Sequence, residues 1–252
     1  MSHTNNKLIP ASRLKAWLQL LRVSNTPTVL SNALSGCAIG AMGAAATDYP
    51  WQALCVVAPS LILIYVAGMA INDALDVETD RKERPHRPIP SGRVSRNAAF
   101  TFAILASLAA LGLLASASLA ACLAGAALVA CAGLYNVVHG MHPASVVLMG
   151  GCRGLSLVTG AAAVGWPPRW EWLAPAAAFL WLYVIALSIV ARGEARGVAG
   201  DRRRVRIVVS MVCAITLIDA VVLGLLGFWA QAGLAVGCFV LAILGQRKIL
   251  GT

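Results

Sequence analysis

A cluster of acidic residues beside a long apolar segment is the part of this sequence that could carry chemistry. Five of the 10 Asp and Glu residues fall between positions 73 and 83. If this stretch is helical, Asn72, Asp76 and Asp80 line one face at four-residue spacing, with Asp73 beside them. Such oxygen ligands suit Mg²⁺, which binds one or two carboxylates together with substrate phosphates. Because close carboxylates repel one another without a cation, we predict a Mg²⁺ site here. A solvated, charged helix end is the alternative.

Basic residues follow the acidic cluster directly, among them Arg81 and Arg87. They could neutralise phosphate oxygens, because the planar arginine fork contacts phosphate at two points. Contact with lipid headgroups is the alternative for any one of them. A metal and arginines at the mouth of an apolar cavity would suit a substrate with a diphosphate head and a hydrocarbon tail. We therefore predict that Asn72, Asp73, Arg81 and Arg87 bind substrate.

Composition indicates where such a site must sit. Hydrophobic residues make up 59% of the 252 residues and charged residues 12%, and the mean hydropathy is +0.78. A soluble domain carries about 25% charged residues, so a disordered chain and an ordinary soluble enzyme are excluded. Because about 20 apolar residues cross a bilayer, we predict eight membrane helices, or seven or nine if one helix is split or re-entrant. Their approximate ranges are 27–46, 51–72, 97–115, 119–138, 144–165, 172–191, 207–228 and 230–245.

The basic residues orient these helices. A net charge of +10 would suggest nucleic acid in a soluble protein, but here 18 of the 20 Lys and Arg residues fall on one side of the predicted spans. Arg169 lies alone on the other side, and Arg153 lies inside a span. By the positive-inside rule, both termini and the acidic cluster face the cytoplasm. We predict a multi-pass protein of the bacterial inner membrane. It forms a single domain over residues 1–252, with residues 1–22 as a cytoplasmic segment and without a cleavable signal peptide. The eighteen are Lys7, Arg13, Lys15, Arg22, Arg81, Lys82, Arg84, Arg87, Arg93, Arg96, Arg192, Arg196, Arg202, Arg203, Arg204, Arg206, Arg247 and Lys248.

The acidic motif also carries a family resemblance. The pattern Asn72-Asp73-x-x-Asp76-x-x-x-Asp80, followed by Arg87-Pro88-x-Pro90-x-Gly92, resembles the first motif of the UbiA superfamily of intramembrane prenyltransferases. The resemblance covers most of the chain, from Arg22-x-x-Asn25-x-Pro27 onward. It implies an all-helical membrane bundle around a central cavity. It also implies two acidic motifs that bind Mg²⁺ and a polyprenyl diphosphate, and transfer of the prenyl group to a small lipophilic acceptor, often aromatic.

Among subgroups, the chain most resembles the EboC-like members. This resemblance rests on Pro27-Thr28-Val29-x-Ser31-Asn32 and on Leu148-Met149-Gly150-x-Cys152-Arg153.

The second acidic motif of the family is degraded. Where the resemblance implies Asp-x-x-x-Asp, residues 191–201 contain only Glu194 and Asp201, among arginines. We predict Asp201 as a metal ligand, and Glu194, Arg192 and Arg196 as substrate-binding residues, because arginines could partly replace a metal as counter-charge. The alternative is a catalytically altered or inactive lipid-binding or transport protein on the same scaffold.

Two charges lie inside predicted spans, where charged residues usually face a cavity or a partner. Arg153 could reach the diphosphate, and Asp219 could pair with Arg153 or orient an acceptor; a structural ion pair is the alternative. Asn32 and Tyr135 are further pocket candidates, and we interpret His139 as a solvated residue that could otherwise serve as a cation. We assign catalysis to Asp76, Asp80 and Arg153, and metal binding to Asn72, Asp76, Asp80 and Asp201. The predicted reaction is electrophilic, with an allylic cation shielded from water.

Overall fold

The described part of the chain is entirely helical. A computed structural model describes residues 13–44, 48–195 and 202–248, and within them we find ten α-helices, two short 3₁₀ helices and no β-strand. The all-helical prediction is confirmed. The elements are α1 (Arg13–Leu20), η1 (Val23–Asn25), α2 (Thr26–Gly43), α3 (Trp51–Leu75), α4 (Val77–Glu83), α5 (Arg96–Ala117), α6 (Leu119–Val138), η2 (Pro143–Ser145), α7 (Val146–Val164), α8 (Trp170–Ala195), α9 (Arg202–Leu225) and α10 (Trp229–Lys248).

Seven described helices, α3 and α5 to α10, are long and apolar enough to cross a membrane. Helix α2 occupies the place of the first predicted span but is not among these seven. Its polar residues, which include Thr28, Asn32 and Ser35, lower its hydropathy, and they are buried by neighbouring helices. A helix enclosed by protein needs no apolar surface toward lipid, so α2 serves as an inner helix of the bundle.

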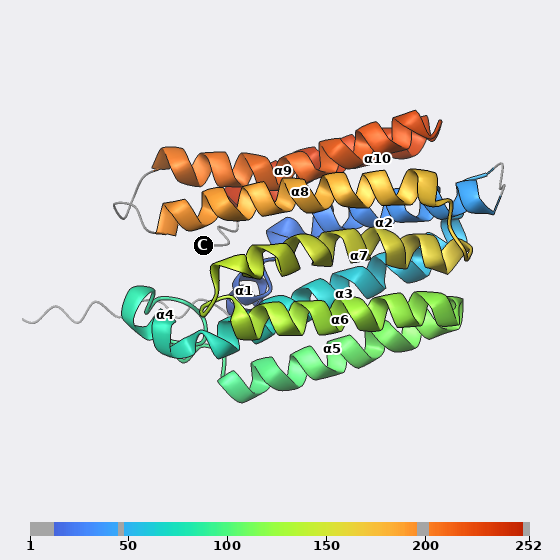
Figure 1. Cartoon of the computed structure of the whole chain (residues 1–252). Helices are drawn as coiled ribbons and strands as arrows, with labels where there is room; N and C mark the ends of the chain where they lie inside the picture. Colours follow the sequence, from blue (N-terminus) through green and yellow to red (C-terminus); the bar gives the residue numbers. More distant parts are fainter. Residues whose placement is uncertain (1–12, 45–47, 196–201, 249–252) are drawn as a thin grey trace, which may run out of the picture.

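The charged segments gather at one end of the bundle. In Figure 1, α1, α4 and the end of α10 lie at the same end, where α7 begins and α8 ends. The end of α2, the start of α3 and the connections α5–α6, α7–α8 and α9–α10 lie at the opposite end, which carries Arg169. The described basic segments therefore share one end, as the charge pattern predicts.

Glycines hold α2 tightly against α7. A Cβ atom on Gly36 would lie 2.8 Å from the carbonyl oxygen of Leu157, and one on Gly160 would lie 2.9 Å from the Cα atom of Gly36. Small residues permit this close backbone approach between membrane helices. The contact fixes the side chains of α2 relative to those of α7, and both helices contribute to the site.

Candidate active site

The acidic cluster lies where α3 ends. Helix α3 ends at Leu75 and α4 begins at Val77, so the helical face that should carry Asn72, Asp76 and Asp80 is interrupted at Asp76. Asn72 and Asp76 share a face, as their spacing predicts, whereas Asp80 lies beyond the interruption in α4 and has other partners. The interruption leaves the acidic residues in two groups with different partners.

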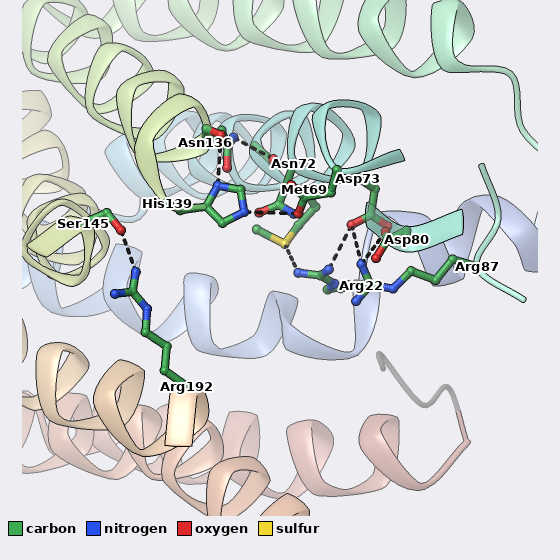
Figure 2. Close-up of polar contacts among 12 residues, drawn as sticks. Arg22, Met69, Asn72, Asp73, Asp80, Arg87, Asn136, His139, Ser145 and Arg192 are labelled. Atoms are coloured by element: carbon green, nitrogen blue, oxygen red, sulfur yellow. Dashed lines mark hydrogen bonds and ion pairs between the residues drawn. The ribbon is translucent and has the colours of Figure 1, made fainter. Parts of the chain in front are cut away.

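The first group centres on Asp76. Asn72 Nδ2 donates to Asp76 Oδ2 at 2.9 Å, and His139 Nε2 lies 3.1 Å from the same oxygen. The other ring nitrogen of His139 lies 2.9 Å from the Asn136 carbonyl oxygen, as Figure 2 shows, and the ring stacks on Tyr135. The hydrogen bond to Asp76 raises the pKa of His139 above its ordinary value of 6.5, although burial acts in the opposite direction. The interpretation of His139 as a solvated residue is therefore wrong.

The second group pairs two aspartates with two arginines. Arg22 Nη2 lies 2.9 Å from Asp73 Oδ1, and Arg87 Nη1 lies 2.8 Å from Asp80 Oδ2 and 3.6 Å from Asp73 Oδ1 (Figure 2). The side chains of Arg87 and Asp80 are only 7% and 5% exposed. Buried charges are tolerated when they are paired in this way. Asp73 and Asp80 are thus already neutralised by the protein.

The backbone of Arg22 is unusual. Its φ of 45° places it in the left-handed region, where it is alone among the described residues other than glycine. This conformation is costly for a residue with a side chain and persists where the surrounding structure fixes it. It turns the chain between α1 and η1 and lets the Arg22 side chain reach both Asp73 and the sulfur of Met69.

The donor set at Asp76 determines how a metal would fit. Among the described residues, no three His, Cys, Asp or Glu side chains form a cluster that could hold a metal. The Asp76 carboxylate and the Asn72 amide remain, and Mg²⁺ commonly binds through one or two carboxylates and substrate phosphates. Asn72 and Asp76 fit this mode, whereas Asp73 and Asp80 are occupied by arginine.

A cavity of about 190 Å³ lies next to this site, between α2, α3, α6, α7, α8 and α9. Its polar lining includes Arg22, Tyr135 and Asn136, which come from the neighbourhood of the acidic cluster. Its walls are otherwise mainly apolar, with Leu61 and Ile64 among them. The predicted combination of an apolar cavity and a polar mouth is present.

Inside the bundle, Arg153 of α7 and Asp219 of α9 are joined through an amide. Arg153 Nη1 donates to Asn32 Oδ1 at 2.7 Å, and Asn32 Nδ2 donates to Asp219 Oδ2 at 2.7 Å. Asp219, which is 1% exposed, also accepts a hydrogen bond from Ser31 Oγ at 2.6 Å. Arg153 lines the cavity. A direct Arg153–Asp219 ion pair, one of the predicted alternatives, is absent from the described residues.

Other predicted residues do not join the site. Arg81 pairs with Glu78 on the surface, where the two side chains are 60% and 72% exposed, so the prediction that it binds substrate is not supported by its position. Arg192 donates to the Pro143 carbonyl oxygen and to Ser145 Oγ, and so ties the end of α8 to η2. Arg196 and Asp201 lie outside the described residues, and Glu194 lies at the end of α8, where only the backbone is described.

The sequence does not indicate the roles of Arg22 and His139 beside the acidic cluster. The sequence places Arg22 among the basic residues and at the start of the family pattern, and no local signal indicates its left-handed backbone. His139 follows Tyr135 by one helical turn, and this spacing could have placed both on one face.

The chain resembles known proteins in sequence. Residues 33–250 match the family model for the UbiA prenyltransferase family. Digeranylgeranylglyceryl phosphate synthase of Sulfolobus acidocaldarius is 38% identical over 102 residues, which cover 40% of this chain and 34% of that protein. The Methanoregula boonei synthase is 53% identical over 53 residues, or 21% of this chain and 18% of that protein. These matches span only about a third or less of each relative.

Solved structures match over nearly the whole chain. A structure of digeranylgeranylglyceryl phosphate synthase superposes with a TM-score of 0.63 at 18% identity and covers 95% of this chain and 96% of that chain. A UbiA homologue from Archaeoglobus fulgidus, bound to DMAPP and Mg²⁺, gives a TM-score of 0.56 at 14% identity and covers 93% and 85%. At these identities the matches show a shared fold.

Proposed function

The chain belongs to the UbiA prenyltransferase family, and on that premise we propose that it transfers a prenyl group from a prenyl diphosphate to a lipophilic acceptor within the membrane. The observation that carries the proposal is the mainly apolar cavity next to the Asn72–Asp76 pair. The diphosphate would bind at this mouth, and the hydrocarbon tail would lie along the apolar walls. The mouth and both termini would face the cytoplasm.

We propose that Asn72 and Asp76 hold Mg²⁺ together with diphosphate oxygens. When bound, Mg²⁺ would stabilise the charge that develops on the leaving diphosphate. His139 keeps the Asp76 carboxylate in place through its hydrogen bond. Asp80 and Asp73 act indirectly, because their contacts hold Arg87 and Arg22 at the mouth.

The proposed reaction breaks the bond between the prenyl C1 atom and the diphosphate oxygen, and the electron pair leaves with the diphosphate. An acceptor carbon or oxygen then bonds to C1 and loses its proton. Arg22 lines the cavity near the acidic cluster, where its positive charge would favour the departing anion. Apolar walls such as Leu61 and Leu128 would exclude water, which otherwise captures an allylic cation.

The test is Mg²⁺-dependent diphosphate release. Purified full-length protein in lipid nanodiscs is incubated with labelled dimethylallyl and geranylgeranyl diphosphates and a panel of phenolic and glyceryl phosphate acceptors. We expect acceptor-dependent release that EDTA removes and Mg²⁺ restores. The degraded second motif favours one rival, an inactive lipid-binding or transport protein. Diphosphate binding without release for any acceptor would support that rival and contradict the proposal.

A further inference from the structure

The left-handed backbone of Arg22 is held by a contact from another helix. Its carbonyl oxygen accepts two hydrogen bonds, one from the Asn25 backbone amide at 3.0 Å and one from the Tyr65 hydroxyl at 3.3 Å. The first closes the turn of η1, and the second joins this turn to α3. A strained backbone persists only where the surrounding contacts fix it. The Tyr65 hydroxyl is therefore part of what keeps Arg22 at the wall of the cavity.

The Tyr65 hydroxyl is itself oriented by Asn25 and Gln246. Its oxygen accepts a hydrogen bond from the Asn25 side-chain amide, and Asn25 Oδ1 accepts one from Gln246 Nε2. Because Asn25 Oδ1 already faces a donor, its Nδ2 group is the one that donates to Tyr65. The three side-chain hydrogen bonds therefore form a directed chain that begins at Gln246 and ends at the Arg22 carbonyl oxygen. Hydrogen bonds in such a chain strengthen one another.

Gln246 reaches Asn25 because the end of α10 packs directly on η1. This contact lies at the end of the bundle that also carries α1 and α4 (Figure 1). Gly245 touches the backbone here, since a Cβ atom at this position would lie 3.2 Å from Ser24 Cα and 3.4 Å from the Ser24 carbonyl oxygen. The missing side chain at Gly245 thus permits the close approach that brings Gln246 to η1.

We propose that Gln246 is a positioning residue for the diphosphate site, which acts through Asn25 and Tyr65 on Arg22. Arg22 lines the cavity and contacts Asp73 of the acidic cluster, and a displaced cation stabilises a bound anion less well. The amide of Gln246 supplies the donor that begins the chain, whereas a carboxylate there would face Asn25 Oδ1 with acceptors only. The inference rests on the proposed function for the identity of the ligand as a diphosphate, but the chain of hydrogen bonds can be tested without ligand.

The experiment compares Gln246→Glu with Gln52→Glu, the same change at an exposed position at the other end of the bundle. Hydrogen–deuterium exchange of η1 is measured first, on full-length protein in lipid nanodiscs without ligand. The protein is then loaded with Mg²⁺ and titrated calorimetrically with the unreactive S-thiolodiphosphate analogue of dimethylallyl diphosphate. We expect Gln246→Glu to speed exchange at the Asn25 amide and to weaken the Kd of the analogue about two- to tenfold, as the loss of one hydrogen bond predicts. Gln52→Glu should change neither quantity.

Two further substitutions show whether the donor itself matters. Gln246→Leu removes the donor without adding charge and should weaken the Kd as Gln246→Glu does. Gln246→His offers a ring N–H at a similar reach and should restore most of the affinity. In a Tyr65→Phe background, which cuts the chain before Arg22, Gln246→Leu should have no further effect on the Kd, because coupled residues are not additive.

A pair of glycines carries the test if the Gln246 variants do not fold. Gly245→Ala presses on Ser24 and should also weaken the Kd, whereas Gly237→Ala in the same helix, where a Cβ atom would meet no atom within 4 Å, should not. Faster exchange with an unchanged Kd would make Gln246 a structural residue only and overturn the proposal. Unchanged exchange in Gln246→Glu, or additive effects of Gln246→Leu and Tyr65→Phe, would also overturn it. Exchange that depends on Gln246 in a protein that never binds the analogue would support the positioning of Arg22 and contradict the proposed function.

Discussion

Aspartate and arginine meet at two places in this molecule, and the contacts differ. At the mouth of the cavity, Arg87 contacts both Asp80 and Asp73 directly, and these charges neutralise each other. Inside the bundle, Asn32 stands between Arg153 and Asp219. Direct pairing places Arg87 against two carboxylates, whereas Arg153 donates to an amide, a backbone carbonyl and a hydroxyl, which carry no charge. The first arrangement cancels its charges locally, and the second keeps a cation at the wall of the cavity.

Breaking the direct pair between Asp80 and Arg87 should have the largest effect on stability. Asp80→Ala leaves Arg87 buried without its closest carboxylate, and loss of one partner from a buried pair costs about 3–5 kcal/mol. We expect a large fall in the thermal unfolding midpoint, measured by tryptophan fluorescence in nanodiscs. Asp80→Ala combined with Arg87→Met should recover part of that loss. A midpoint unchanged in Asp80→Ala would mean that Asp80 is not a structural partner.

Asp76 should behave in the opposite way to Asp80. It is the acidic residue at the mouth without an arginine partner in the described residues, so Asp76→Ala should leave the unfolding midpoint close to wild type. It should lower Mg²⁺-dependent diphosphate release by about 100-fold or more, because several kcal/mol of charge stabilisation depend on the metal. Activity retained in Asp76→Ala would contradict the assignment of Asp76 to the metal.

The interior arrangement depends on how closely α2 approaches α7. A Cβ atom on Gly36 would meet backbone atoms of Leu157 and Gly160, so Gly36→Ala should destabilise the protein by about 1–3 kcal/mol. The matched control is Gly133→Ala in α6, where a Cβ atom would meet no atom within 4 Å. Equal unfolding midpoints for the two variants would show that the α2–α7 contact accommodates the added methyl group without loss of stability.

Breaking the exposed Arg81–Glu78 pair should have the smallest effect on stability and activity. Arg81 and Glu78 pair in solvent, and such pairs contribute about 0–1 kcal/mol. Glu78→Gln should therefore leave both stability and diphosphate release near wild-type values, measured in the same two assays. A loss of activity in Glu78→Gln would mean that Arg81 reaches substrate, as the sequence alone suggests.

The sequence predicts the bundle better than the site. Long apolar runs and one-sided basic residues identify the spans and their common end, because lipid imposes these properties on composition. The four-residue spacing of Asn72 and Asp76 predicts their contact, because such residues lie one helical turn apart. The pairing of Asp80 with Arg87 depends on the break at Asp76, which propensity does not reveal.

Contacts between distant segments are harder still to predict. Arg153 and Asn32 are 121 residues apart in the chain and meet only because α2 packs on α7. The sequence marked both as pocket candidates, and it could not show that an amide separates Arg153 from Asp219.

The low hydropathy of α2 has a consequence for how the protein is made. Ser31 and Asn32 of α2 emerge from the ribosome long before Asp219, their partner 188 and 187 residues later. Ser31 Oγ also bonds the Thr28 carbonyl oxygen within α2, but Asn32 Nδ2 finds its acceptor on α9, and an unpartnered aspartate costs about 2.5–3.5 kcal/mol at a helix centre. We therefore expect α2 and α9 to reach their final positions in the membrane together, late in biogenesis, when the bundle closes around α2.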